Sequence, residues 1–467
     1  MTVGRLVIPA LRWRADTGFR HEEGVVDAAL RSGAGGFIVF GGPAAEVATL
    51  TARLRAAAGR PLLIGADLER GAGQQFEGLR EVPPPAALSS LGDLDVVREA
   101  GLVTGADARA VGVNWLYGPV ADLDLEPKNP IVQTRSFGPD PARVAAAVGA
   151  WIDGARAAGV LTCAKHFPGH GRTVRDSHDQ LPIVAASRAE LEANDLIPFR
   201  AAIRAGVDAV MTCHVAFPAL DPAGLPATLS APILGMLREA LGFRGLVVSD
   251  ALIMDALRDR GTVVDVSLAV VAAGVDLLLY PPDPEATIAA LTLRAGRDPT
   301  FRRCVDAALD KYQAALATAA EIRPTEAAPA GTAALADRIV GQGAPPTKLR
   351  APIDLEIVDD DLDGAFPASS SDGVRTALTE LGVPLGGGGS RIVLAFAEPR
   401  ASKGRGGFGP RGREQLAAAR DRAAVIVLFA HRRLTTELPS GIPVLLAWHR
   451  QPLMQAAAAR WIAGAIR

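Results

Sequence analysis

The sequence has 467 residues, of which 49 are Lys or Arg and 51 are Asp or Glu, so its formal net charge at pH 7 is −2. This balance gives no electrostatic attraction to nucleic acid or to an anionic membrane, which argues against both as partners and favours a small, neutral or weakly charged ligand. The length is sufficient for roughly two or three domains.

The cysteines and the N-terminal segment indicate the cellular context. Cys163, Cys213 and Cys304 lack CxxC spacing, so the sequence supports neither a disulfide framework nor a thiolate zinc site. The N-terminal "MTVGRLVIPALRWRADTGFR" carries Arg where a signal peptide would have to be apolar, and the longest apolar runs elsewhere have the length of strands. We therefore expect a soluble cytoplasmic protein.

The first 320 residues alternate short apolar runs with Ala-rich stretches of helical period, which is typical of repeated βα units. Strands are expected within 4–11, 35–42, 61–69, 113–123, 160–167, 208–217, 245–254 and 275–283. Helices are expected near 23–32, 44–59, 94–110, 140–158, 187–204, 231–240, 264–273 and 284–295.

Eight such units predict a TIM-type (β/α)8 barrel, an α/β fold of roughly 250 residues plus insertions. A doubly wound open sheet is the competing fold. The barrel is favoured because no Gly-rich phosphate fingerprint follows the first strand, where a dinucleotide-binding sheet would carry one.

The chain is expected to continue with a second, smaller domain. A last helix over about 300–321 completes a barrel domain of residues 1–322, and the Pro-, Ala- and Gly-rich segment 323–350 is interpreted as a linker. Residues 351–467 then predict a short α/β domain. Its strands are expected in "IDLEIV", "RIVLAFA", "AAVIVLFAH" and "IPVLLAWHR", and its helices over 371–382, 411–421 and 451–463.

Polar residues at the carboxyl ends of barrel strands face the active site, so these positions are the first candidates for chemistry. The third strand ends in Asp67 and Glu69, the fifth in Lys165 and His166, the sixth in His214, and the seventh in Ser249 and Asp250. A single charged residue at a strand end is often only a loop residue that reaches water. Their recurrence directly after apolar runs favours one shared site.

Asp250 is delivered by "GLVVSDALIMDAL" from a buried strand into a segment that soon becomes helical. A fixed carboxylate at that point suits a nucleophile or a group that stabilises a cation. It suits equally well an N-cap for the following helix, a position that Asp also favours. The position alone leaves both interpretations open.

The segment "CAKHFPGHGRTVRDSHDQLP" holds four of the seven histidines. Its glycines and prolines prevent a helix, so His166 and His170 cannot be a helical metal pair. Asp176 lies two residues before His178, close enough to orient its imidazole as a general acid/base. A surface contact without function and a pair of metal ligands are the alternatives, and His170 is expected to be structural.

These residues carry a family resemblance. The motifs "KHFPGHG", "DSH", "SFG" preceded by Arg135, and "VVSDALIMDAL" together resemble glycoside hydrolase family 3, in its β-N-acetylhexosaminidase branch, over about residues 1–320. The resemblance implies a retaining exo-β-N-acetylglucosaminidase in which Asp250 is the nucleophile, His178 the acid/base and Asp176 the residue that orients His178. It implies no metal and no cofactor.

The resemblance also implies a sugar-binding set and two departures from the family pattern. The implied substrate-binding residues are Asp67, Arg135, Lys165, His166 and His214, together with Gln75. Gln75, in "DLERGAGQQF", stands where family members that act on peptidoglycan fragments carry an Arg, which puts a muropeptide substrate in doubt. Ala251 stands where many members have a second Asp after the nucleophile.

Several other functions remain open. A phosphorylase or a β-glucosidase of the same family would use the same residues, since a histidine acid/base repels phosphate less than a carboxylate does. A metal-dependent barrel hydrolase would use His166, His170, His178 and His214 as ligands, but the first strand lacks an HxH pair. A non-catalytic glycan-binding barrel is the remaining alternative. The aglycone, the oligomeric state and the purpose of the second domain stay open.

Overall fold

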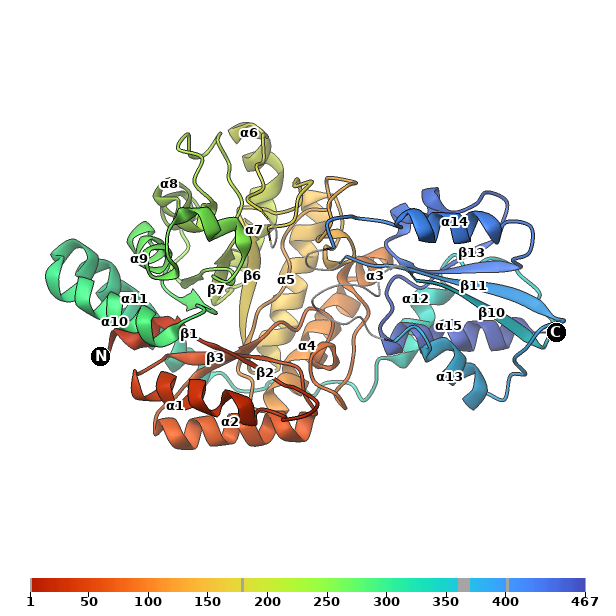
Figure 1. Cartoon of the computed structure of the whole chain (residues 1–467), viewed down its shortest axis with the longest axis horizontal. Coiled ribbons are helices and arrows are strands. Elements are labelled where there is room, and N and C mark those ends of the chain that lie inside the picture. Colours follow the sequence, from red (N-terminus) through yellow and green to blue (C-terminus); the bar gives the residue numbers. More distant parts are fainter. Residues whose placement is uncertain (1, 178–179, 360–369, 400–402, 467) are drawn as a thin grey trace.

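The computed structural model describes residues 2–177, 180–359, 370–399 and 403–466. Eight parallel strand positions form a ring, so the barrel prediction is confirmed. The barrel lies at the N-terminal side of the molecule, and the C-terminal sheet lies at the other side (Figure 1). Each predicted apolar run contains one of the eight barrel positions. The strands are β1 (Val7–Ile8) and β2 (Ala10–Arg12), β3 (Gly36–Phe40), β4 (Leu63–Ala66), β5 (Trp115–Leu116), β6 (Leu161–Phe167), β7 (Ala209–Thr212), β8 (Leu246–Val248) and β9 (Leu278–Leu279).

Two details explain how the ring closes. Strands β2 to β8 form one seven-stranded sheet in sequential order, and β9 pairs with β1. Pro9, which has no N–H to donate, separates β1 from β2 within a single predicted strand. A parallel bridge between Val248 and Leu277, with Ser249 N–H donating to Leu277 O at 3.0 Å, joins β8 to the segment that enters β9.

Helices surround the ring as expected from the sequence. They are α1 (Glu23–Arg31), α2 (Ala44–Ala58), α3 (Pro85–Ser90), α4 (Leu94–Ala110), α5 (Pro141–Ala157), α6 (Arg188–Glu190), α7 (Leu196–Arg204), α8 (Ala231–Gly235), α9 (Val263–Ala273), α10 (Pro284–Arg297) and α11 (Pro299–Glu321). Short α3 was not expected. The predicted helix 187–204 is divided by a π-helical segment, Leu191–Asp195, and the one over 231–240 ends in another, Met236–Ala240.

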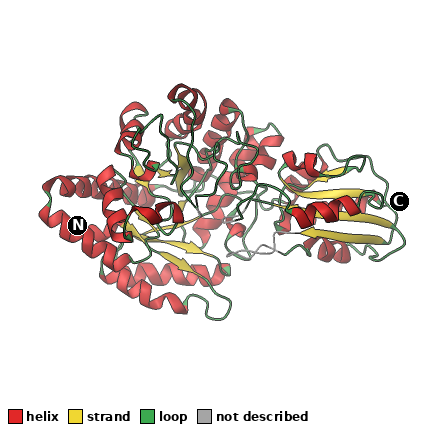
Figure 2. Ribbon diagram, turned by 45° about the horizontal axis from the view of Figure 1, so that its top comes forward, coloured by secondary structure: helices red, strands yellow, loops and turns green. Residues whose placement is uncertain are grey.

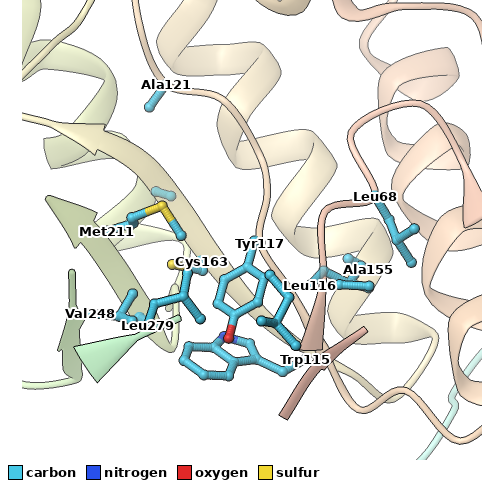
Figure 3. Packing of buried hydrophobic residues seen from close by; sticks show 14 of the residues in the cluster. Leu68, Trp115, Leu116, Tyr117, Ala121, Ala155, Cys163, Met211, Val248 and Leu279 are labelled. Atoms are coloured by element: carbon cyan, nitrogen blue, oxygen red, sulfur yellow. The ribbon is translucent and has the colours of Figure 1, made fainter. Parts of the chain in front are cut away.

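Side chains, not solvent, fill the ring. Trp115 and Tyr117 are fully buried with ring centroids 4.7 Å apart, and Figure 3 shows them with Cys163 and Met211 between the strands. A Cβ atom at Gly65 would lie 2.6 Å from the Tyr117 ring, so glycine is required for this close approach. The packed interior leaves the carboxyl ends of the strands as the place where a ligand can enter.

The C-terminal residues form a second parallel sheet beside the barrel (Figure 2), with strands in sequential order. Its strands are β10 (Ile353–Asp359), β11 (Ser390–Ala397), β12 (Val425–Ala430) and β13 (Val444–Leu446), and its helices are α12 (Ala333–Gly341), α13 (Gly373–Glu380), α14 (Pro410–Ala418) and α15 (Pro452–Ala465). Helix α12 lies inside the segment expected to be a linker.

Alternation along the strands gives this sheet two apolar faces. Ile392, Leu394 and Phe396 of β11 pack in a core that is continuous with the barrel and includes α12, α13 and α15. Val393 and Ala395 face a separate core that includes Leu416 of α14. Within the part of the chain that the structure describes, no helix is long and apolar enough to cross a membrane.

Candidate active site

A cavity of about 280 Å³ lies at the carboxyl ends of the barrel strands. Its lining includes six of the predicted catalytic and substrate-binding residues: Asp67, Gln75, Arg135, Lys165, His166 and Asp250. Asp67 and Gln75 follow β4, Lys165 and His166 lie near the end of β6, and Asp250 follows β8. Arg135 belongs to a short 3-10 helix, Gln133–Arg135. The barrel thus brings together side chains that are up to 183 residues apart in the sequence, from Asp67 to Asp250.

The centre of this wall is a buried network of ionised groups. Lys165 Nζ lies 2.7 Å from Asp67 Oδ1 and 2.7 Å from Glu69 Oε1. Arg135 holds both oxygens of Glu69, with Nε and Nη2 each at 2.8 Å. Burial alone would raise the pKa of Glu69, but Arg135 and Lys165 outweigh it and hold this pKa well below its ordinary value. Both carboxylates therefore act as fixed acceptors for Lys165.

His166 is oriented by Asp122, a residue that the sequence analysis missed. Its Nδ1 lies 2.6 Å from Asp122 Oδ2, and Asp122 Oδ1 accepts from the backbone N–H of His170 at 2.7 Å. Burial would raise the pKa of Asp122, but His166 outweighs that effect and the pKa is lowered. The position of Asp122 at the end of the run "VNWLYGPVADL" was the available signal.

Asp250 follows β8 and lines the cavity. Its Oδ1 accepts from the backbone N–H of Ala251 at 2.8 Å. The next helical segments are capped at Met254 and Thr262, so the N-cap interpretation of Asp250 is wrong. The carboxylate sits on a strand end and faces the cavity, as a nucleophile must.

His214 does not line the cavity and lies behind the segment that carries Asp250. Its Nε2 donates to Ala251 O at 3.1 Å, and its Nδ1 lies 2.8 Å from Thr228 Oγ1. His214 is fully buried. From this position it supports the backbone next to Asp250.

The loop after β6 is held by His170. Its Nδ1 lies 2.9 Å from Thr173 Oγ1 and its Nε2 lies 3.0 Å from Ser177 Oγ. Burial, with a further contribution from His166, lowers the pKa of His170 to about 4, so the ring is neutral at pH 7. Ser177 reaches the cavity lining and Asp176, beside it, is 2% exposed. The proposed acid/base His178 lies outside the described residues.

The contacts of the described histidines argue against a metal-dependent barrel hydrolase. Both ring nitrogens of His170 and of His214 are occupied by protein groups. Within residues 2–177, 180–359, 370–399 and 403–466, no three His, Cys, Asp or Glu side chains are grouped as a metal site requires.

Aromatic and C-terminal residues complete the wall, and the sequence analysis identified none of them. Phe40 and Tyr280 line the cavity, with the Arg12 guanidinium 4.2 Å and 5.2 Å from their ring centroids. His449 and Pro399 enter from the second sheet. Gln75 also lines the cavity, and its Oε1 accepts from the Gly41 N–H at 3.2 Å.

Comparisons with known proteins agree with this architecture. The sequence model described as "Glycosyl hydrolase family 3 N terminal domain" matches residues 21–303. A protein of Cellulomonas fimi named beta-N-acetylglucosaminidase/beta-glucosidase is 39% identical over 256 residues, which span 53% of this chain and 45% of that protein. A beta-hexosaminidase of Xylella fastidiosa (strain M23) is 40% identical over 262 residues, which span 54% of this chain and 76% of that protein.

A solved structure extends the likeness to the second sheet. The glycoside hydrolase family 3 beta-N-acetylglucosaminidase from Paenibacillus sp. str. FPU-7 is 28% identical, with a TM-score of 0.80 and coverage of 100% of this chain and 96% of that one. The family model alone covers more than half of the sequence and includes Asp67, Arg135, Lys165 and Asp250. The chain belongs to glycosyl hydrolase family 3.

Proposed function

We propose that the chain removes terminal β-linked N-acetylglucosamine residues by a retaining mechanism in two steps. The relatives named beta-N-acetylglucosaminidase and beta-hexosaminidase support this substrate class. The observation that carries the proposal is the placement of Asp250 in one cavity with Asp67, Arg135 and Lys165. A carboxylate that can attack a sugar carbon then lies beside charged groups that can hold the sugar's hydroxyls.

In the first step, an oxygen of Asp250 bonds to the anomeric carbon while the bond to the leaving oxygen breaks. The leaving oxygen takes a proton, which we assign to His178. In the second step, His178 removes a proton from water, and the water oxygen displaces Asp250 from the anomeric carbon. The released sugar keeps its β configuration, and Asp250 and His178 return to their starting states.

The assignment of the proton to a histidine is supported by the charge state of the cavity. Retaining glycosidases usually use a second carboxyl group as the acid. Here the pKa of Glu69 is held well below its ordinary value, so this carboxyl carries no proton at neutral pH. A histidine, with an ordinary pKa of about 6.5, can act as the acid in one step and as the base in the next.

The proposal is tested by substrate choice and product stereochemistry. An aryl β-N-acetylglucosaminide and the matching aryl β-glucoside are incubated with the enzyme, with and without phosphate, and the first-formed sugar is followed by NMR. We expect preference for the N-acetylglucosaminide and release of the β anomer. Preference for the glucoside would contradict the substrate assignment, and a first-formed α anomer would contradict the mechanism. A sugar 1-phosphate that depends on added phosphate would identify a phosphorylase.

A further inference from the structure

Arg70 is a cavity residue that the proposed chemistry does not use, and the backbone fixes its position. Its N–H donates to Gln74 Oε1 at 2.9 Å, and its carbonyl accepts from the Val82 N–H at 2.9 Å. Gly71, with φ of +82°, turns the chain directly after it, and a Cβ there would lie 2.5 Å from Arg80 O. The loop therefore presents the Arg70 side chain to the cavity in a defined position.

The contacts of its guanidinium come from the second sheet and are neutral. Arg70 Nη1 lies 3.4 Å from His449 Nδ1 and 3.3 Å from Gln451 Oε1. His449 Nδ1 also accepts from the Gln451 N–H at 3.1 Å, so the ring proton is on Nε2, which lies 2.9 Å from Glu398 Oε2. Burial, reinforced by Arg70, lowers the pKa of His449, which keeps the ring uncharged at neutral pH.

The carboxylates around Arg70 are bound to other groups. Glu69 is held by Arg135 and Lys165, whereas Glu398 lies 3.2 Å from Arg450 Nε. Glu81 Oε2 accepts from the Leu453 N–H at 2.7 Å. Among the described residues, no carboxylate oxygen lies within 4.0 Å of the Arg70 guanidinium. Arg135 and Lys165, by contrast, are each paired directly with an acid.

We propose that Arg70 binds an oxyanion inside the cavity, and that His449 and Gln451 of the second sheet position it for this role. The anion is either a carboxylate on the aglycone of the substrate or free phosphate. A guanidinium matches both, because its planar donors can form two parallel hydrogen bonds to such a group. The inference rests on the proposed function, since the anion would bind in the same cavity as the sugar. It gives the second sheet a part in substrate selection.

The test measures binding, so that it does not depend on turnover. Three ligands are titrated calorimetrically into the full chain: an S-linked β-N-acetylglucosaminide whose aglycone ends in a carboxylate, the same compound as its primary amide, and inorganic phosphate. We expect the carboxylate compound to bind about 10- to 100-fold more tightly than the amide, or phosphate to bind measurably. The first result identifies an anionic aglycone and the second identifies phosphate.

Two variants change the charge at this position, one in the barrel and one in the segment after β13. Arg70→Gln removes it, and Gln451→Glu places a carboxylate beside it. Both should abolish the anion preference, whereas Arg70→Lys, which keeps the charge without the planar donors, should retain part of it. Arg302→Gln, the same substitution as the first at a solvent-exposed helical position, is the matched control. Equal unfolding midpoints would establish that all variants are folded.

Two outcomes would overturn the inference. In one, wild type binds the carboxylate and amide compounds equally and does not bind phosphate. In the other, an anion preference persists in Arg70→Gln. If the proposed function is wrong, the pattern is different, because neither glycoside binds. The role of Arg70 is then tested by comparing phosphate binding to wild type and to Arg70→Gln.

Discussion

The two sheets place ionisable residues by the same rule and use them differently. Both are parallel, and both carry these residues at or shortly after the carboxyl ends of their strands: Asp67, Lys165 and Asp250 in the barrel, Glu398 and His449 in the open sheet. The barrel ends surround a cavity. Pro399 and His449, which follow strands of the open sheet, line one part of that cavity, and Glu398 is paired with Arg450 beside them. A ring of strands leaves room for a ligand, whereas the edge of a four-stranded sheet supplies one wall.

The largest expected effect tests whether the barrel edge carries the chemistry. Asp250→Ala should lower kcat/KM for an aryl β-N-acetylglucosaminide by at least about 1000-fold, because the nucleophile is lost. Asp259→Asn, at an exposed position nearby in the sequence, should leave the rate unchanged. If Asp250→Ala kept its activity while glycan binding persisted, the glycan-binding interpretation would replace the enzymatic one.

The next effect compares one buried carboxylate from each sheet. Glu69→Gln leaves Arg135 and Lys165 with less compensation in a buried site, so we expect the free energy of unfolding to fall by about 3 kcal/mol, together with activity. Glu398→Gln should lower the free energy of unfolding by less, about 2 kcal/mol, because Arg450 remains paired with Asp359 at 2.8 Å after the carboxylate of Glu398 is lost. Urea unfolding and steady-state kinetics measure both quantities. If Glu398→Gln lowered activity more than Glu69→Gln, the view that the barrel carries the chemistry and the second sheet only supports it would be wrong.

An effect no larger than that of Glu398→Gln concerns pH and the loop after β6. The folded-state pKa of His170 is about 4, below its value of about 6.5 in an unfolded chain. The unfolded state therefore binds the proton first, so the contribution of His170 to stability is complete above pH 6.5 and is lost as the pH falls toward 4. Between pH 7 and pH 5 we expect wild type to lose about 2 kcal/mol more than His170→Gln.

This pH difference is measured by urea unfolding at both values with wild type and His170→Gln. His449→Gln gives the corresponding comparison in the second sheet, because burial also lowers the pKa of His449. If wild type and His170→Gln lost the same stability between pH 7 and pH 5, the neutral state assigned to His170 would be wrong.

Local pattern was enough to predict the barrel and most of its polar lining. Apolar runs of strand length, separated by helical periods, contain the barrel strands except for Arg12 at the end of β2, and reading the strand ends found Asp67, Lys165, His166 and Asp250. Local pattern also predicted that His214 belongs to the shared site. His214 follows a strand as expected, but its side chain does not line the cavity and donates to Ala251 O. Strand position fixes which edge of the sheet a residue reaches, and packing decides where its side chain points.

What could not be predicted depends on contacts across the chain. Arg70 and His449 are 379 residues apart and acquire their roles only where the sheets meet. Arg70 lies in the segment "DLERGAGQQF", where the family pattern drew attention to Gln75. His449 is a lone histidine after a strand in a small α/β domain, which gives no signal of a cavity. Asp122 was also missed, because its role depends on its contact with His166, and His166 had been assigned only to sugar binding.

The entry of His449 into the cavity wall has a consequence for the order of folding during synthesis. Domains generally fold N-terminal first as the chain emerges, so the barrel strands can close before β13 exists. At that stage the strands that carry Asp67, Lys165 and Asp250 are in place, but His449 and Pro399 are missing from the cavity wall and Arg70 lacks its partners. The anion selectivity that we propose for Arg70 would then be acquired only when the second sheet docks.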